Sequence, residues 1–153
     1  MNKDKVIEKL QKGSKWITVI CILAVLFNIA GIFRMAGHVR AIAEPDPVMK
    51  YVLFREFASL GINIAMMSLA AWMFLKISKD GTPFCMRNVW IVRVIGILFL
   101  LNAVIPSVAA PSENITPFFM PNYTALMEGL LFLFIAHVIR YGAMLQQESD
   151  ETL

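Results

Sequence analysis

The fold of this chain is decided at Lys76-Ile77-Ser78-Lys79-Asp80-Gly81-Thr82-Pro83-Phe84-Cys85-Met86-Arg87, a short, basic stretch between two long apolar runs. Gly81 and Pro83 are turn-forming residues, and the residues around them lack the apolar periodicity that would continue a helix. One apolar run closes at Leu75 and the next opens at Val89. We therefore predict that the chain reverses here, and that the two runs form a transmembrane hairpin whose connecting loop stays on one side of a bilayer.

The composition extends this prediction to the whole chain. Of its 153 residues, 58% are hydrophobic and 16% are charged, against roughly 45–50% and about 25% in soluble globular domains. Four apolar runs each approach the roughly 20 residues that cross a bilayer. The sequence therefore predicts an all-α polytopic membrane protein, a single membrane domain that forms a four-transmembrane-helix bundle. The expected spans are residues 16–36, 53–76, 88–108 and 121–145.

Basic residues are distributed unequally between the two ends of the predicted spans. Ten lie on the side of the termini and the middle loop, namely Lys3, Lys5, Lys9, Lys12, Lys15, Lys76, Lys79, Arg87, Arg93 and Arg140. Four lie on the other side, namely Arg34, Arg40, Lys50 and Arg55. Because basic loops stay inside the cell, we predict that both termini are cytoplasmic, with cytoplasmic segments 1–15, 77–87 and 146–153, and that the protein lies in the cell inner membrane. The pI near 9.0 then reflects membrane orientation, and no direct nucleic-acid partner is predicted.

Three further segments have more local interpretations. The lysine-rich residues 1–15 serve as an orientation signal or lie as a short helix on the anionic inner leaflet. Residues 106–121 contain four prolines, which cannot donate backbone hydrogen bonds, so an irregular outer cap is expected. The acidic residues at 146–153 are placed to pair with Lys79 or Arg87, an exposed pairing that stabilises by only about 0–1 kcal/mol.

Polar residues inside the predicted spans are candidates for function, because polar groups are costly in lipid. Five of them lie in the outer half of the predicted bilayer, namely Asn28, Glu56, Asn63, Asn102 and Glu128. Glu128 lies roughly 10 Å inside its helix end and needs a proton or a positive partner, for which Arg34 and Arg55 are the candidates. Two interpretations stay open. The cluster holds the bundle together through interhelical hydrogen bonds, or it forms an outward-opening pocket for a small ligand or ion.

The sequence contains few patterns typical of helix packing and none typical of catalysis. Gly61 and Ala65 are four residues apart, a small-xxx-small pair that allows close helix approach. The ten methionines are interpreted as adaptable packing rather than metal ligands. Neither Cys21 nor Cys85 lies in a C-x-x-C pair, and no Gly-rich phosphate loop or HExxH motif occurs. The sequence therefore predicts no enzyme, no catalytic residue, no metal site and no cofactor.

Two stretches carry a family resemblance. Lys79-Asp80-Gly81-Thr82-Pro83-Phe84, followed by Arg87, resembles the central motif of domain-of-unknown-function family 2975 (DUF2975), a group of small bacterial four-helix membrane proteins. The end of the chain, Ala136-His137-Val138-Ile139-Arg140-Tyr141-Gly142-Ala143-Met144-Leu145 with its acidic tail, is similar to the end of that family. The resemblance implies the four-helix membrane fold and carries no established activity. Members are often encoded beside a small helix-turn-helix regulator, which implies a partner.

Two hypotheses of function follow. The first is a non-enzymatic membrane protein that signals to a small cytoplasmic helix-turn-helix transcription regulator. Its partner-binding residues are Lys79, Asp80, Gly81, Pro83, Phe84, Arg87, Glu148 and Asp150. The alternative is a small transporter, or a sensor that binds a ligand or ion, built on the polar cluster around Glu128. The lipid bilayer is a further expected partner, and self-association into a homo-oligomer stays open.

Overall fold

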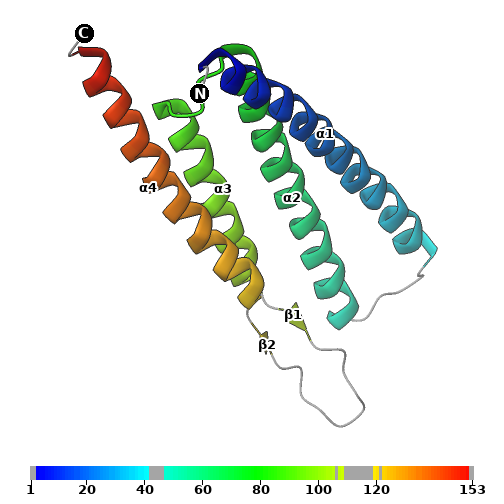
Figure 1. The fold of residues 1–153 in the computed structure, drawn as a ribbon. Helices are drawn as coiled ribbons and strands as arrows, with labels where there is room; N and C mark the ends of the chain where they lie inside the picture. Colours follow the sequence, from blue (N-terminus) through cyan, green and yellow to red (C-terminus); the bar gives the residue numbers. More distant parts are fainter. Residues whose placement is uncertain (1–2, 42–46, 106, 109–118, 121, 152–153) are drawn as a thin grey trace.

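Four long helices make up most of the molecule. The computed structural model describes residues 3–41, 47–105, 107–108, 119–120 and 122–151. The helices are α1 (Lys3–Ala41), α2 (Pro47–Asp80), α3 (Met86–Val104) and α4 (Tyr123–Glu151), and two short strands, β1 (Ser107–Val108) and β2 (Phe119–Met120), lie between α3 and α4 (Figure 1). All four helices are long and apolar enough to span a membrane. The all-helical architecture with four candidate spans is therefore confirmed.

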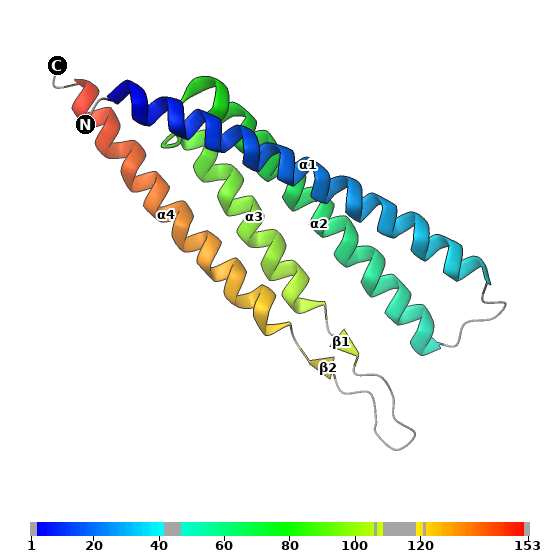
Figure 2. The ribbon, with the colours of Figure 1, turned by 45° about the vertical axis from the view of Figure 1, so that its right-hand side comes forward.

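The helices are arranged as two hairpins. α1 packs along α2, α3 packs along α4, and contacts between α2 and α3 join the two pairs. Both views show the α2–α3 loop, residues 81–85, at the same end of the bundle as the start of α1 and the end of α4 (Figures 1 and 2). We call this end the loop end and the opposite one the strand end. The reversal predicted at Gly81 and Pro83 is present, because α2 stops at Asp80 and α3 starts at Met86.

α1 is one unbroken helix of 39 residues from Lys3. The predicted span, residues 16–36, lies inside it, and the lysine-rich start continues the same helix axis. Residues 3–15 are therefore not a separate short helix, and their position relative to the inner leaflet stays a prediction. Residues 3–15 lack Pro, and their one glycine, Gly13, is far less disruptive to a helix than a proline would be.

α3 ends earlier than the predicted span 88–108. Its last helical residue is Val104, and Ile105 is extended, with φ −70° and ψ 103°. Ile105 precedes Pro106, whose ring clashes with a helical conformation at the residue before it. The backbone then forms β1, which pairs antiparallel with β2 in the register Ser107↔Met120 and Val108↔Phe119. The predicted irregular cap thus has a short paired base, while its residues 109–118 lie outside the described part of the chain.

α4 begins two residues after the predicted start at Pro121, which itself lies outside the described residues. Asn122 caps the helix, because its Oδ1 accepts a hydrogen bond from the backbone N–H of Ala125 at 3.2 Å. The backbone N–H of Asn122 also donates to the carbonyl of Ala103 at 3.1 Å, which ties the start of α4 to the end of α3. At the other end, α4 continues to Glu151, so the predicted acidic tail is helical through that residue.

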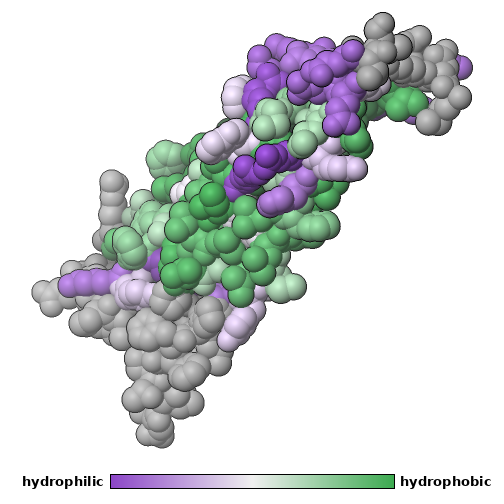
Figure 3. Space-filling model, turned by 90° about the vertical axis from the view of Figure 1, so that its left-hand side faces the viewer, coloured by the Kyte–Doolittle hydropathy of each residue, from purple (hydrophilic) through white to green (hydrophobic). Residues whose placement is uncertain are grey.

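The core is a narrow apolar seam between α2, α3 and α4. It comprises Met66, Met73, Ile77, Ile91, Val92, Ile95 and Ala136. Many large apolar side chains are instead exposed, and Phe27, for example, is 82% exposed. Figure 3 shows apolar residues covering the middle of one face, with hydrophilic residues gathered toward the loop end. This inside-and-outside apolar pattern is what a bundle surrounded by lipid requires, because lipid gives no reason to hide apolar surface.

α3 and α4 approach each other closely at a pair of glycines. A Cβ atom on Gly96 would lie 3.1 Å from the carbonyl oxygen of Gly129, and one on Gly129 would lie 3.0 Å from the carbonyl oxygen of Gly96. Beside this crossing, the rings of Phe99 and Phe132 stack with centroids 5.3 Å apart. The predicted packing role of Gly61 is wrong, because a Cβ there would meet no atom within 4 Å. The glycine pair that brings helices together comes from two different helices instead.

Candidate functional site

The α2–α3 loop is built on a left-handed glycine. Gly81 has φ +65°, and its backbone N–H donates to the carbonyl of Ile77 at 2.8 Å. This is the common way for a helix to end, since glycine adopts positive φ without the steric penalty of a side chain. Pro83 follows two residues later and prevents the helix from resuming. The two residues singled out in the sequence therefore set the turn.

A buried asparagine fixes the rest of the loop. Asn88, in the first turn of α3, is 0% exposed. Its Nδ2 donates to the carbonyl of Pro83 at 2.9 Å and lies 3.4 Å from the carbonyl of Thr82. Its Oδ1 is buried and has no hydrogen-bond partner among the described residues. Sequence reasoning missed Asn88, which is the first residue of the predicted third span.

Asp80 and Arg87 clasp the two sides of the loop. Arg87 Nη2 lies 3.2 Å from Asp80 Oδ2, and both side chains are more than a third exposed. Such a pair is screened by solvent and contributes at most about 1 kcal/mol. Within the described residues, Arg87 Nε is buried without a hydrogen-bond partner. Arg87 thus pairs with Asp80, seven residues before it, and the pairing of the acidic end of the chain with Lys79 or Arg87 stays a prediction.

The first turns of α1 rest on the loop. Gln11 Nε2 donates to the carbonyl of Lys79 at 3.4 Å, and a Cβ on Gly81 would lie 3.1 Å from Ile7 Cγ2. Glycine suits this position by its backbone conformation, and a larger residue would also press on Ile7. The loop is held from three directions, by the end of α2, by the start of α3 and by α1.

Phe84 connects the loop to α4. Its ring lies against Gly142, where an added Cβ would be 2.7 Å from Phe84 Cδ1, and 45% of the residue remains exposed. Glu148 is exposed on α4, six residues after Gly142, which is about 9 Å further along the helix axis. The side chain of Asp150 lies outside the described part of the chain.

The predicted partner-binding residues are therefore partly gathered. Six of them come together at the loop: Lys79, Asp80, Gly81, Pro83, Phe84 and Arg87. Lys79, Asp80 and Phe84 are exposed, whereas Gly81 and Arg87 are half-buried. The carbonyl of Pro83 accepts the hydrogen bond from Asn88. Glu148 is on the part of α4 that leaves from beside Phe84.

The predicted polar cluster toward the strand end is not joined by hydrogen bonds in the described part of the chain. Asn28 Nδ2 donates to the carbonyl of Ala24 in its own helix at 2.7 Å. Glu56 pairs with its neighbour Arg55 at 3.1 Å, so Arg55 is not the partner of Glu128. No interhelical hydrogen bond involves Asn63, Asn102 or Glu128 within the described residues, and all three are half-buried. Asn28 and Glu56 thus form contacts within their own helices.

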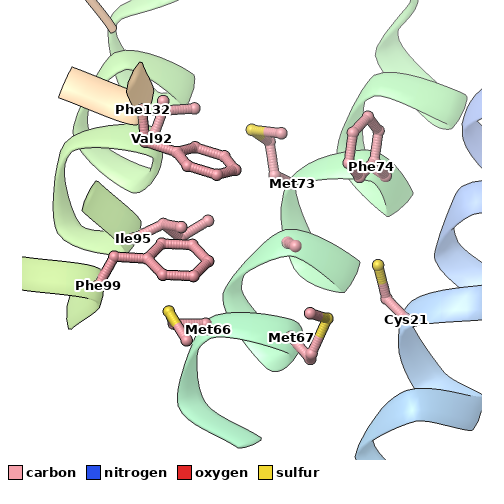
Figure 4. Close-up of a pocket in the computed structure, with 10 residues that line it drawn as sticks. Cys21, Met66, Met67, Met73, Phe74, Val92, Ile95, Phe99 and Phe132 are labelled. Carbon is pink, nitrogen blue, oxygen red and sulfur yellow. The ribbon is translucent and has the colours of Figure 1, made fainter. Parts of the chain in front are cut away.

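Two apolar cavities lie along the seam between the hairpins, and no sequence pattern predicts them. One, of about 260 Å³, is bordered by Cys21 of α1, by Met66 and Met67 of α2 and by Phe99 of α3 (Figure 4). The other, of about 340 Å³, lies nearer the loop, with Pro83, Phe84 and Asn88 among its lining residues. In the described residues, no three His, Cys, Asp or Glu side chains are grouped so that they could hold a metal ion.

Comparison with known proteins gives one match. A family model described as a protein of unknown function, DUF2975, matches residues 49–153. The matched segment covers α2 from its third residue, the α2–α3 loop, α3 and α4. No curated protein and no solved structure matches the chain.

Proposed function

The chain belongs to the DUF2975 family, and from that premise we propose that it is a non-enzymatic membrane protein that binds a small cytoplasmic helix-turn-helix regulator. The binding surface in this proposal is the α2–α3 loop together with the end of α4. The observation that carries it is that the loop is a preformed, solvent-facing structure. Gly81, Asn88 and the Asp80–Arg87 pair hold it in one shape.

Preorganisation is what makes this loop suitable for recognition. A loop that is already ordered loses little conformational entropy when a partner binds, so more of the contact energy appears as affinity. Phe84 presents an exposed aromatic ring beside the charged Lys79 and Asp80. Aromatic and charged residues in this mixture are typical of the centre and rim of protein–protein interfaces.

The end of α4 supplies charge of the opposite sign to a DNA-binding protein. Glu148 and Glu151 are exposed on α4, and the sequence places Asp150 between them. DNA-binding domains carry a basic surface for phosphate contacts, so an acidic helix end attracts such a surface and competes with DNA for it. This supports a restraining role, in which the regulator bound at the membrane is withheld from DNA.

The proposal requires the loop end to face the cytoplasm of a bacterial inner membrane. The basic residues support this orientation, since Lys5, Lys9, Lys12 and Lys15 follow one another along the start of α1. We expect alkaline phosphatase fused after Leu153 to be inactive, and green fluorescent protein fused there to be fluorescent. Alkaline phosphatase inserted within residues 109–118 is expected to be active. An active phosphatase after Leu153 would place the loop on the wrong side and end the proposal.

Co-purification tests the binding surface itself. A small helix-turn-helix regulator encoded beside the gene is expected to co-purify with the detergent-solubilised protein. Truncation after residue 145 or Phe84→Ala is expected to weaken this binding about tenfold or more, as loss of an interface anchor does. The matched control is Phe134→Ala, which removes an exposed phenylalanine from the middle of α4. Binding that survives both loop-end changes, or that falls equally with Phe134→Ala, would contradict the assignment of this surface.

A further inference from the structure

Together, the two apolar cavities are called the slot. They share Met73 and Phe74 of α2, Val92 of α3 and Phe132 of α4 as lining residues, so they adjoin along the same seam. On α2 the lining runs from Met66 to Ile77, which is about 16 Å along the helix axis. Figure 4 shows Met73, Val92 and Phe132 directed toward the space between the helices, with Phe99 and Met66 further toward the strand end. The slot is therefore long and narrow.

One polar side chain lines the slot, and it lies at the loop end. Asn88 is the only residue in the slot lining that has a hydrogen-bonding side chain apart from the Cys21 thiol at the far end. Its two carbonyl partners, Pro83 and Thr82, can only accept hydrogen bonds, so the nitrogen must face them and the oxygen must face away. That oxygen is buried without a donor in the described part of the chain. An unpaired buried acceptor of this kind is rare and costly.

We propose that the slot binds a neutral, single-chain amphiphile that donates one hydrogen bond to Asn88 Oδ1. The chain of the ligand lies along the seam from Asn88 toward Met66. This inference concerns ligand binding alone and does not depend on the regulator or on the surface that binds it.

The chemistry of the lining selects this class of ligand. A water molecule in an apolar cavity needs two to four polar partners, and this end of the slot offers one. A charged head group would be buried without a counter-charge, because no acidic or basic residue lines the slot. A hydroxyl group on an alkyl chain supplies the missing donor. It needs no further polar partners in the slot and buries no charge. The alkyl chain then fills space that is already apolar, which stabilises it by roughly 0.8 kcal/mol per buried methylene relative to water.

Entry of the ligand requires a small rearrangement. Asn88 is sealed from solvent, so a hydroxyl group reaches its oxygen after a neighbouring lining side chain turns aside. Met73 borders both cavities, and its unbranched thioether side chain changes rotamer at low cost.

Binding of dodecanol, compared with dodecane, tests the proposal. The full-length protein is placed in lipid nanodiscs, and uptake of each radiolabelled compound is measured against nanodiscs that contain no protein. We expect one saturable, protein-dependent site for dodecanol, with an affinity at least about tenfold higher than for dodecane, because only the alcohol satisfies the buried oxygen. Equal affinities for the two compounds would overturn the proposal and indicate ordinary partitioning of apolar chains into the seam.

Two substitutions on α3 locate the site. Val92→Phe fills the slot, because Val92 is buried and borders both cavities, and it is expected to abolish saturable binding of dodecanol. Ile97→Phe is the matched control, since Ile97 is 49% exposed on the same helix, and it is expected to leave binding unchanged. Asn88→Ala is expected to reduce the affinity for dodecanol to that for dodecane. If Asn88→Ala fails to fold, comparison of Val92→Phe with Ile97→Phe still tests the proposal. Saturable dodecanol binding that persists in Val92→Phe would show that the ligand does not bind in the slot.

Discussion

Replacing Gly129 with valine is expected to destabilise the α3–α4 hairpin by about 1–3 kcal/mol, the usual cost of overpacking a close contact. The first side-chain atom of the new residue would lie 2.8 Å from Leu100 Cδ2 and 3.0 Å from the carbonyl oxygen of Gly96. Leu100 can turn aside, but the backbone of α3 cannot move without separating the two helices. The free energy of unfolding in mixed detergent micelles, followed by circular dichroism during titration with dodecyl sulfate, measures the loss.

Gly61 provides a matched control for this substitution. It also lies in a helix, and a Cβ on it would meet no atom within 4 Å. The intrinsic helix propensity of valine changes both variants in the same direction, so the difference between them isolates the contact at the crossing. Gly61→Val is expected to stay within about 0.5 kcal/mol of the parent protein. Equal destabilisation of the two variants would show that Gly96 and Gly129 do not form the crossing.

Asn88→Ala is expected to destabilise the loop end by about 1–3 kcal/mol, the cost of leaving a buried polar group without its hydrogen bond. The change removes the hydrogen-bond donor to the carbonyl of Pro83. It also leaves a cavity, because the Asn88 side chain is fully buried. Part of the loss is offset, because the unpaired Oδ1 disappears as well. We therefore expect loosening of the α2–α3 loop rather than unfolding of the whole bundle.

Cys85 reports this loosening directly. It lies in the loop and is half-buried, so its rate of reaction with a maleimide measures how often the loop opens. In a Cys21→Ala background, Asn88→Ala is expected to increase this rate by about tenfold, in line with the destabilisation above. Asn102→Ala is the control, since Asn102 is half-buried on the same helix and has no interhelical hydrogen bond within the described residues. An unchanged rate in Asn88→Ala would mean that the asparagine does not hold the loop.

The helices and the central turn could be predicted because their signals are local. The length of an apolar run, the glycine that ends α2 and the proline that follows it are all written in consecutive residues. The early end of α3 also has a local signal, because Ile105 precedes Pro106. The prediction of a span through residue 108 did not take this signal into account. Local signals thus determine where helices begin and end.

The contacts between helices could not be predicted in the same way. Gly61, Gly96 and Gly129 are alike in sequence, and which of them meets another helix depends on how the faces of four helices are rotated. The same holds for the polar residues of the spans. Their depth follows from counting residues, but Asn28 bonds to its own helix and Glu56 to its neighbour. Asn88 was missed for the related reason that its partners, two loop carbonyls, have no side-chain signature.

The unbroken course of α1 has a mechanical consequence. At about 1.5 Å per residue a helix of 39 residues is roughly 58 Å long, which exceeds the about 40–45 Å of a complete bilayer. Such a rod adjusts to its surroundings by tilting, and the tilt follows the thickness of the hydrocarbon layer. Near the start of α1, Ile7 lies against Gly81, and Gln11 hydrogen-bonds to the carbonyl of Lys79. A change in the tilt of α1 is therefore expected to tighten or loosen these contacts with the α2–α3 loop. We therefore expect the contact between the start of α1 and the α2–α3 loop to depend on the thickness of the lipid.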